Sequence, residues 1–223
     1  LFKRRPELRR SFHLSLIDSL EAALVPRHSP PESVYSLIDD LVDMRIRMGL
    51  MGDDLTHPAY RRIAELGFSA VPVLIEHVDD PRLTRSVWVG FNNFTPWHPR
   101  VGHVVSNLLQ DIAGEDLGKD WLTRQKGWPL GVEGVQAWWS RAQRVGEEAY
   151  FVERAIPEST EVTWPNQTAL WILARNHPHR LGELYERILK RRPRMESRTI
   201  ADAVASSSLP AADKRRLLGP VAQ

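Results

Sequence analysis

Two kinds of residue in this chain have types and spacings that suit chemistry, namely paired aspartates and paired histidines. The aspartate pairs are Asp39-Asp40, Asp53-Asp54 and Asp79-Asp80. Two adjacent carboxyl groups can act as general acid and general base when burial separates their pKa values. All three pairs fall on an expected helix face or in an expected turn, where Asp commonly caps a helix or forms the turn. The sequence therefore favours a structural role for these carboxylates over catalysis.

The histidine pairs would act chemically by binding a metal ion. His98 and His103 are five residues apart, and His177 and His179 flank Pro178. A catalytic zinc site uses three protein ligands, and the chain contains no cysteine that could supply the third. We therefore expect surface or helix-capping histidines, no metal site and no cofactor.

A cluster of aromatic residues in the segment 88–100 is the first candidate for a binding surface. This segment holds two Trp, two Phe, two Asn and one His, and Gly and Pro interrupt it. Aromatic residues in a loop often bind partners because they combine a large contact area with a polar group. The alternative is that the rings fill a groove between helix pairs, since a large exposed aromatic cluster favours aggregation. The candidate binding residues here are Trp88, Phe91, Phe94, Trp97 and His98.

Four other tryptophans occur in a second group, which consists of Trp121, Trp128, Trp138 and Trp139. Trp138 and Trp139 are adjacent, so in a helix only one of them can point directly into the core. We expect this group to anchor the core and a neighbouring loop. The alternative is a stacking platform for bases, sugars or peptide proline.

Charge is distributed unevenly although the formal net charge is only +2. Residues 187–216 contain nine basic and three acidic side chains, whereas residues 32–54 contain six acidic and two basic ones. A basic edge can neutralise several phosphates of a nucleic acid. The alternative is ordinary solubilising charge near helix C-termini, where it also complements the helix dipole. The candidate binding residues in this region are Arg187, Arg191 and Arg192.

Apolar residues recur at helical spacing along most of the chain. The clearest stripe is Val101, Val104, Val105, Leu108, Leu109 and Ile112, followed by Gly114. This i, i+3, i+4, i+7 pattern predicts a helix with one buried face. Similar stripes predict helices over 6–24, 32–50, 57–66, 71–78, 135–145, 167–177, 181–189, 200–206 and 211–218. No alternating pattern is long enough to predict a substantial sheet, and no apolar run reaches the roughly 18 residues of a membrane span.

Residues 64–82, with the sequence AELGFSAVPVLIEHVDDPR, resemble a HEAT repeat. That repeat has a helix, a turn with a small residue and a second helix with an early Pro and Leu at helical spacing. An Asp-Asp-Pro-like turn and a basic residue follow. The segments 101–114, 135–145, 167–189 and 200–218 resemble degenerate copies. The resemblance implies an all-α fold, a HEAT-like α-solenoid of stacked antiparallel helix pairs, with irregular loop insertions at 82–100 and 114–131.

We expect a single helical-repeat domain over 1–223. It would comprise an N-terminal helix pair (1–54), HEAT-like repeats with the aromatic insertion (55–147) and C-terminal helix pairs (148–223). No Gly-x-Ser-x-Gly, phosphate loop or dinucleotide motif is present, so a non-enzyme is favoured. The predicted function is a non-catalytic scaffold that binds a protein partner. The alternative is a nucleic-acid or other polyanion binder, a class in which some HEAT-like proteins modify DNA. A soluble, cytoplasmic protein is slightly favoured.

Overall fold

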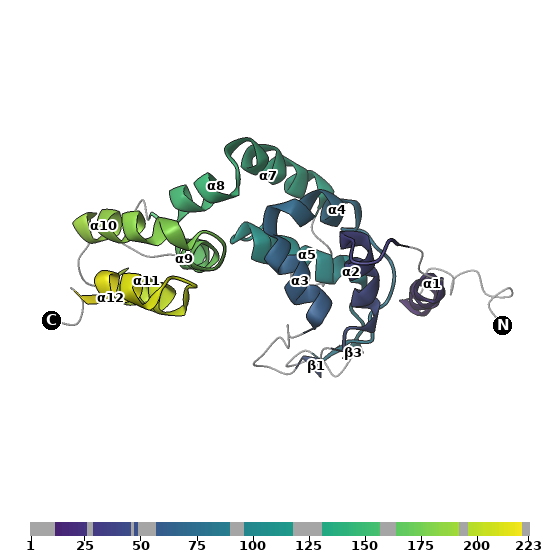
Figure 1. The fold of residues 1–223 in the computed structure, drawn as a ribbon. Helices are drawn as coiled ribbons and strands as arrows, with labels where there is room; N and C mark the ends of the chain where they lie inside the picture. Colours follow the sequence, from purple (N-terminus) through teal and green to yellow (C-terminus); the bar gives the residue numbers. More distant parts are fainter. Residues whose placement is uncertain are drawn as a thin grey trace, which may run out of the picture. The chain divides into compact units, whose positions relative to one another are not determined.

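The computed structural model describes residues 12–25, 29–45, 47–48, 57–89, 96–117, 131–156, 164–191 and 196–219. These residues form a helical protein with one small sheet (Figure 1), which confirms the expected all-α class in outline. The chain divides into two units. The first comprises Leu1–Ile112 and Leu117–Trp138, and the second comprises Ala113–Asp116 and Trp139–Gln223. The division falls inside the range 55–147 that the sequence assigned to HEAT-like repeats.

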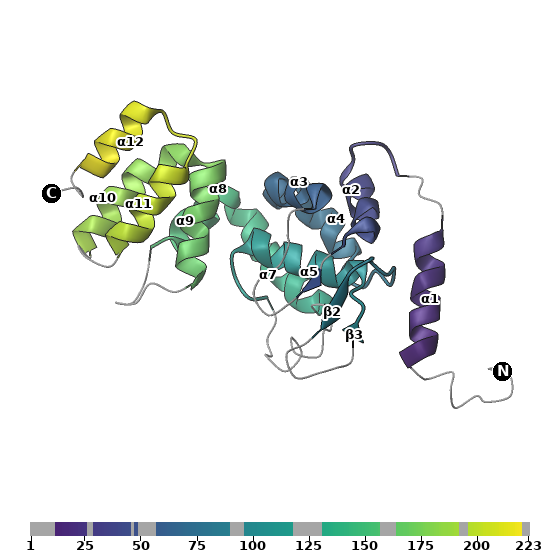
Figure 2. The same cartoon turned by 90° about the horizontal axis from the view of Figure 1, so that it is seen from below.

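The first unit contains the helices α1 to α5, two 3-10 helices, the sheet and the beginning of α7. The elements are α1 (Phe12–Leu24), α2 (Val34–Asp40), η3 (Leu41–Asp43), β1 (Arg47–Met48), α3 (Pro58–Leu66), η4 (Gly67–Ala70), α4 (Val71–Glu76), β2 (Val87–Val89), β3 (Pro96–Trp97), α5 (Val101–Ala113) and α7 (Val132–Val145). In both ribbon views α2, α3, α4 and α5 are grouped together (Figures 1 and 2).

Helix α5 supplies much of the core of the first unit. All six residues of its predicted stripe are buried, with Val101, Val105, Leu108 and Leu109 fully inaccessible. The helix ends next to Gly114, whose φ of +64° lies in the left-handed region that favours glycine. The predicted helix and its predicted end are both confirmed.

The helix pair with the strongest HEAT resemblance also lies where the sequence placed it. α3 begins at Pro58, which occupies a first-turn position, and α4 has Pro72 in its first turn. Between them η4 places Phe68 edge-to-face against Trp138 of α7, with ring centroids 5.9 Å apart. Trp138 is 2% exposed whereas Trp139 is only half-buried. The prediction that one of these adjacent tryptophans enters the core is confirmed.

The second predicted helix, 32–50, is wrong over its C-terminal half. α2 ends at Asp40, η3 ends at Asp43, and Met44 is already extended with ψ of 126°. The backbone after η3 instead bonds to a distant segment, because Val42 O accepts from Arg85 N and Met44 O accepts from the Ser86 hydroxyl. Tertiary hydrogen bonds thus replace the helical ones that the sequence predicted after Asp43.

The segment 82–100, predicted as a loop insertion, contains two of the three strands of the sheet in the first unit, β2 and β3. β2 pairs in parallel with β1, with Arg47 opposite Val87, and antiparallel with β3, with Trp88 opposite Trp97. An isolated antiparallel bridge joins Leu83 to Arg100. The strands have only two or three residues each, which agrees with the absence of a long alternating pattern in the sequence.

The second unit contains the remainder of α7 and the elements that follow it. These are α8 (Glu147–Arg154), α9 (Trp164–Asn176), η5 (Pro178–Arg180), α10 (Leu181–Arg191), α11 (Glu196–Ser206) and α12 (Ala211–Leu218). α9 contacts both α8 and α11, and α11 also contacts α10 and α12 (Figure 2). The helices α9 to α12 match the predicted helical segments, whereas α8 was not predicted.

A half-buried carboxylate, Glu115, joins the elements at the start of this unit. Glu115 accepts a hydrogen bond from the Tyr150 hydroxyl at 2.6 Å and forms an ion pair with Arg154. The guanidinium carbon of Arg154 also lies 4.9 Å from the centroid of the Tyr150 ring. Asn166 of α9 donates to the carbonyl oxygen of Arg154. These contacts join the turn after α5 to α8 and α9.

None of the described helices is both long enough and apolar enough to cross a membrane.

Candidate interaction surface

Three large apolar side chains of helix α1 lie on the outside of the first unit, while Leu16 is half-buried. Ile17, Leu20 and Leu24 are 37%, 49% and 81% exposed, and Val25 just beyond the helix is 64% exposed. The sequence predicted a buried face for this stripe, so that expectation is wrong for Leu20 and Leu24. We call the four residues Ile17, Leu20, Leu24 and Val25 the α1 stripe.

Among the described side chains of α1, the least exposed are the small residues Ser19, Ala22 and Ala23 and the half-buried Leu16. Ser19 is 1% exposed, and Ala22 and Ala23 are half-buried. Successive residues of a helix are about 100° apart, so Ser19 lies almost opposite Leu24 and Ile17. Small side chains allow close backbone approach, and the Leu83 N–H donates to the carbonyl oxygen of Ser19 at 3.2 Å. This contact fixes which face of α1 points outward.

The segment that receives α1 is held by a buried ionic cluster of Asp39, Asp80, Arg82 and His77, which we call the clamp. Arg82 donates from Nη2 to Asp80 Oδ2 at 2.7 Å and from Nη1 to Asp39 Oδ1. The side chains of Asp80, Asp39 and Arg82 are only 6%, 12% and 17% exposed. The clamp joins α2, the end of α4 and the extended segment that carries Leu83.

Further hydrogen bonds give both carboxylates of the clamp, Asp80 and Asp39, additional partners. His77 Nδ1 lies 3.0 Å from Asp80 Oδ2, and the Arg82 main-chain N–H donates to Asp80 Oδ1 at 3.0 Å. The Ser29 hydroxyl donates to Asp39 Oδ2 at 2.6 Å. Burial of an ion pair is favourable only when such extra hydrogen bonds satisfy the remaining lone pairs.

The electrostatics of the clamp follow from this geometry. Burial alone would raise the pKa of Asp80, but hydrogen bonds from His77 and Arg82 outweigh it and lower that pKa to about 2. The hydrogen bond to Asp80 raises the pKa of Arg82 above its ordinary value, against the effect of burial. Both groups are therefore charged at neutral pH, and the clamp is an ion pair rather than an acid–base couple.

Helix α5 packs directly against the turn that contains the clamp. The Gly102 N–H donates to Asp80 O at 3.1 Å, and the Val101 N–H donates to Arg82 O at 2.8 Å. A Cβ atom at Gly102 would lie 2.3 Å from Val78 O and 3.0 Å from Asp80 N. Only glycine allows this approach of α5 to the turn. Thr84 continues the attachment by donating its hydroxyl to Pro99 O at 2.9 Å.

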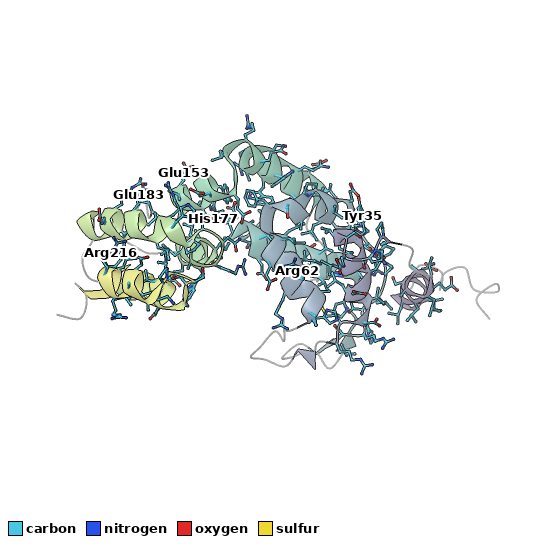
Figure 3. All side chains as sticks on the ribbon, viewed as in Figure 1. Tyr35, Arg62, Glu153, His177, Glu183 and Arg216 are labelled. Carbon is cyan, nitrogen blue, oxygen red and sulfur yellow. The ribbon has the colours of Figure 1, made fainter. Side chains whose placement is uncertain are left out.

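At the outer side of the clamp, Tyr35 contacts His77 edge-to-face with ring centroids 5.8 Å apart. The Tyr35 hydroxyl donates to Glu76 Oε2 at 2.8 Å, and this hydrogen bond raises the Tyr35 pKa. Figure 3 shows Tyr35 on the surface of the first unit. The contacts tie α2 to α4 and explain why an aromatic ring is exposed here.

The aromatic candidates from the sequence lie in or beside the small sheet. The backbones of Trp88 and Trp97 are register partners in β2 and β3. Phe91 and Phe94 lie outside the described residues, as do Trp121 and Trp128. His98 follows β3 and is half-buried. The structure thus brings two of the candidates together in the backbone register, and their binding role stays a prediction.

The basic candidates lie in the second unit. Arg187 of α10 is about half exposed and forms an ion pair with Glu183 at 3.4 Å. Arg191 is the last residue of α10, and Arg192 lies outside the described residues. On α12, Arg216 is 75% exposed and pairs with Asp213 at 3.2 Å, while Lys214 donates to Ala205 O. Figure 3 shows Glu183 and Arg216 in this unit.

The candidate histidines that the structure describes lie beside main-chain or acidic groups. His103 Nδ1 accepts from the Arg100 N–H at 3.0 Å at the start of α5. His177 and His179 both approach Glu148 Oε2, at 3.7 and 3.5 Å, and Arg180 approaches the other oxygen at 3.1 Å. Within the described part of the chain, no group of three or more His, Asp and Glu side chains is arranged to hold a metal ion.

Sequence analysis missed both the clamp and the outward orientation of α1. Asp39, Asp80 and Arg82 were visible as doublets and as the Asp-Asp-Pro-Arg turn, but nothing in the spacing shows that Asp39 and Asp80 share the guanidinium of Arg82. The spacing carried no clear signal for α1, because the small residues Ser19, Ala22 and Ala23 share their side of the helix with Leu16.

No family model matches the chain, and no curated protein and no solved structure matches it significantly.

Proposed function

We propose that this protein is a non-catalytic protein–protein interaction module built from helix pairs of the HEAT type, and that the α1 stripe is its contact surface. The observation that carries the proposal is the orientation of α1, which packs through Ser19 and leaves Leu20 and Leu24 outside. Three large apolar side chains, Ile17, Leu20 and Leu24, lie on two turns of α1, with Val25 just beyond the helix, and exposed apolar groups of this kind mark interaction sites.

The energetics support a partner for this surface. Covering a leucine or isoleucine side chain completely contributes about 2 kcal/mol. The outward face of α1 also differs from that of a solubilising helix, because Leu24 is 81% exposed and Leu20 49% exposed on it. The clamp and the Ser19–Leu83 contact hold the stripe on a firm base, which limits the ordering cost of binding.

HEAT-type pairing remains part of the proposal and rests on the α3–η4–α4 unit and on the chain of contacts from α8 through α9 and α11 to α12. Such helix pairs commonly present extended surfaces to other proteins. The absence of a recognised catalytic motif from the sequence agrees with this reading.

The proposal is tested by affinity capture with the full chain as bait, in nuclease-treated lysate of the source organism. The matched variants are Leu20→Ser/Leu24→Ser on the stripe and Arg215→Ala/Arg216→Ala on α12. We expect a protein that is retained by the wild type, lost with the stripe variant and kept with the α12 variant. If the stripe variant retains the captured protein as well as the wild type does, the α1 stripe is not the contact surface.

Nucleic acid is the second candidate partner, favoured by the exposed Arg215 and Arg216 of α12. Arg187 and Arg216 form ion pairs with acidic neighbours, which reduces the positive charge available to phosphates and makes nucleic-acid binding less favourable. The measurement is the affinity for a short DNA duplex at 50 and 200 mM salt. A strong fall with salt, together with loss in Arg215→Ala/Arg216→Ala, would establish this alternative.

A further inference from the structure

The shape of the α1 stripe suits one helix better than a broad surface. Ile17, Leu20 and Leu24 follow one another at intervals of three and four residues, which is the spacing of a seam between two helices. From Ile17 to Leu24 the seam is about 10 Å long. A helix laid along it would cover all three side chains, as in the helix-in-groove mode of recognition.

The charges beside the stripe are acidic. Glu21 lies between Ile17 and Leu24 on the helix surface, and Asp18 lies next to Glu21 on the same side; both are exposed. Between Leu16 and Val25, where the side chains are described, α1 carries no basic residue. The stripe therefore has an acidic border along one side. A partner with complementary charge carries basic residues along the edge that faces this border.

This border argues against two other occupants. In an antiparallel pair of α1 helices from two copies, Glu21 would face Glu21, and like charges at such positions are destabilising. In a parallel pair, Glu21 would face residues such as Leu16 or Ala23, which supply no positive charge. An anionic lipid surface would be repelled by Asp18 and Glu21.

We infer that the α1 stripe binds an amphipathic helix whose apolar seam is bordered by lysine or arginine. This inference rests on the proposed function and specifies the class of partner. The apolar seams of the two helices meet along Ile17, Leu20 and Leu24, while the basic border of the partner pairs with Asp18 and Glu21. The clamp and the Ser19–Leu83 contact keep the receiving helix in place.

Two designed helical peptides test the inference with the full chain. Both have the same leucine seam, and one has lysine borders where the other has glutamate. Binding is followed by fluorescence anisotropy. We expect the wild type to bind the lysine peptide at least tenfold more tightly than the glutamate peptide. Leu20→Ser/Leu24→Ser should lose binding of both, and Asp18→Lys/Glu21→Lys should reverse the preference.

The matched control is Glu133→Lys/Glu186→Lys, which makes the same charge change on exposed residues of α7 and α10. This control should keep the preference for the lysine peptide. If it loses that preference as fully as the α1 charge variant does, the attraction is nonspecific and the inference is overturned. Circular dichroism of each variant checks that the helices are retained.

Other outcomes also decide the question. Equal affinity for the two peptides, or no binding of either, overturns the inference. Stripe-dependent dimerisation in sedimentation would assign the surface to a second copy, and stripe-dependent binding to phosphatidylcholine–phosphatidylserine vesicles would assign it to lipid. If the affinity capture still returns a stripe-dependent protein while the peptides show no preference, the proposed function stands and only the basic-helix inference fails.

Discussion

Arg82 and Asp80 are two residues apart, and the guanidinium of one is bonded to both carboxylate oxygens of the other, with Nε to Oδ1 at 3.0 Å and Nη2 to Oδ2 at 2.7 Å. The same guanidinium reaches Asp39, which is 43 residues earlier in the chain. This arrangement makes a local turn into a junction between α2, α4 and the segment that supports α1.

Removing the guanidinium should destabilise the first unit strongly. Arg82→Ala leaves two largely buried carboxylates without their common partner, and we expect a loss of about 3 kcal/mol in the free energy of unfolding. Arg82→Lys should recover only part, because one ammonium group cannot bond both carboxylates in fork geometry. Hydrogen exchange of core amides in α5 measures the effect for this unit. As a control, Arg62→Ala removes an exposed pair with Glu65 and should cost less than about 0.5 kcal/mol.

Protonation of Asp80 at low pH should lower the free energy of unfolding of the first unit. Its pKa is lowered to about 2 from an ordinary value of 3.8, so the native state binds the proton less tightly than the unfolded state. The stabilisation is complete above about pH 4 and is lost as the pH falls through 2, with a size of about 2 kcal/mol. Urea unfolding at pH 5, 3 and 2 measures it. Asp80→Asn should flatten this pH dependence, and an equally steep curve in the variant would contradict the assignment.

A methyl group at Gly102 should separate α5 from the turn. The added Cβ would lie 2.3 Å from Val78 O, which is backbone and cannot move aside cheaply. We expect Gly102→Ala to cost about 3 kcal/mol, at the upper end for overpacking. Gly134→Ala on α7 is the matched control, since its nearest neighbour would be Leu117 O at 3.7 Å; it should be neutral or stabilise by up to about 1 kcal/mol through helix propensity. Thermal unfolding of the two variants compares them.

The orientation of α1 can be tested by exchanging large and small side chains. Ser19→Leu should detach α1, because Ser19 is buried against the Leu83 segment. Leu24→Ser should change the free energy of unfolding by less than about 0.5 kcal/mol, since surface substitutions away from packed features are nearly neutral. Proteolysis of the segment around α1 reports detachment. If Leu24→Ser exposes α1 to protease and Ser19→Leu does not, the helix is oriented the other way.

In the second unit, removing the half-buried Glu115 carboxylate should lower the free energy of unfolding. Glu115→Ala leaves the Tyr150 hydroxyl and Arg154 without their common acceptor, and we expect a loss of about 2 kcal/mol. Glu153→Ala, on the same helix as both of them but exposed (Figure 3), should change stability by less than about 0.5 kcal/mol. Urea unfolding monitored by circular dichroism compares the two variants.

Most helices of this protein were predictable because their stripes are local patterns. The α5 stripe and the α3–α4 pair needed only apolar spacing, a first-turn proline and a closing glycine. The C-terminal half of the helix predicted over 32–50 failed for a different reason. Residues 44–48 have the sequence Met-Arg-Ile-Arg-Met, an alternation too short to predict a strand by itself, and Met44 O and the β1 backbone find partners in Ser86 and β2, far along the chain.

The candidate surface was predictable in part only. The sequence alone determined that α1 is a helix with one apolar face, since the period of its leucines fixes that face. Which face would be covered depended on contacts that no local pattern contains. The Leu83 N–H approaches the small residues around Ser19, and Arg82 joins carboxylates from two helices to hold Leu83 there. Periodicity determines the elements, because it acts between neighbours in the chain. Only the tertiary structure decided that the apolar side of α1 faces outward, because that depends on long-range hydrogen bonds and charge pairing.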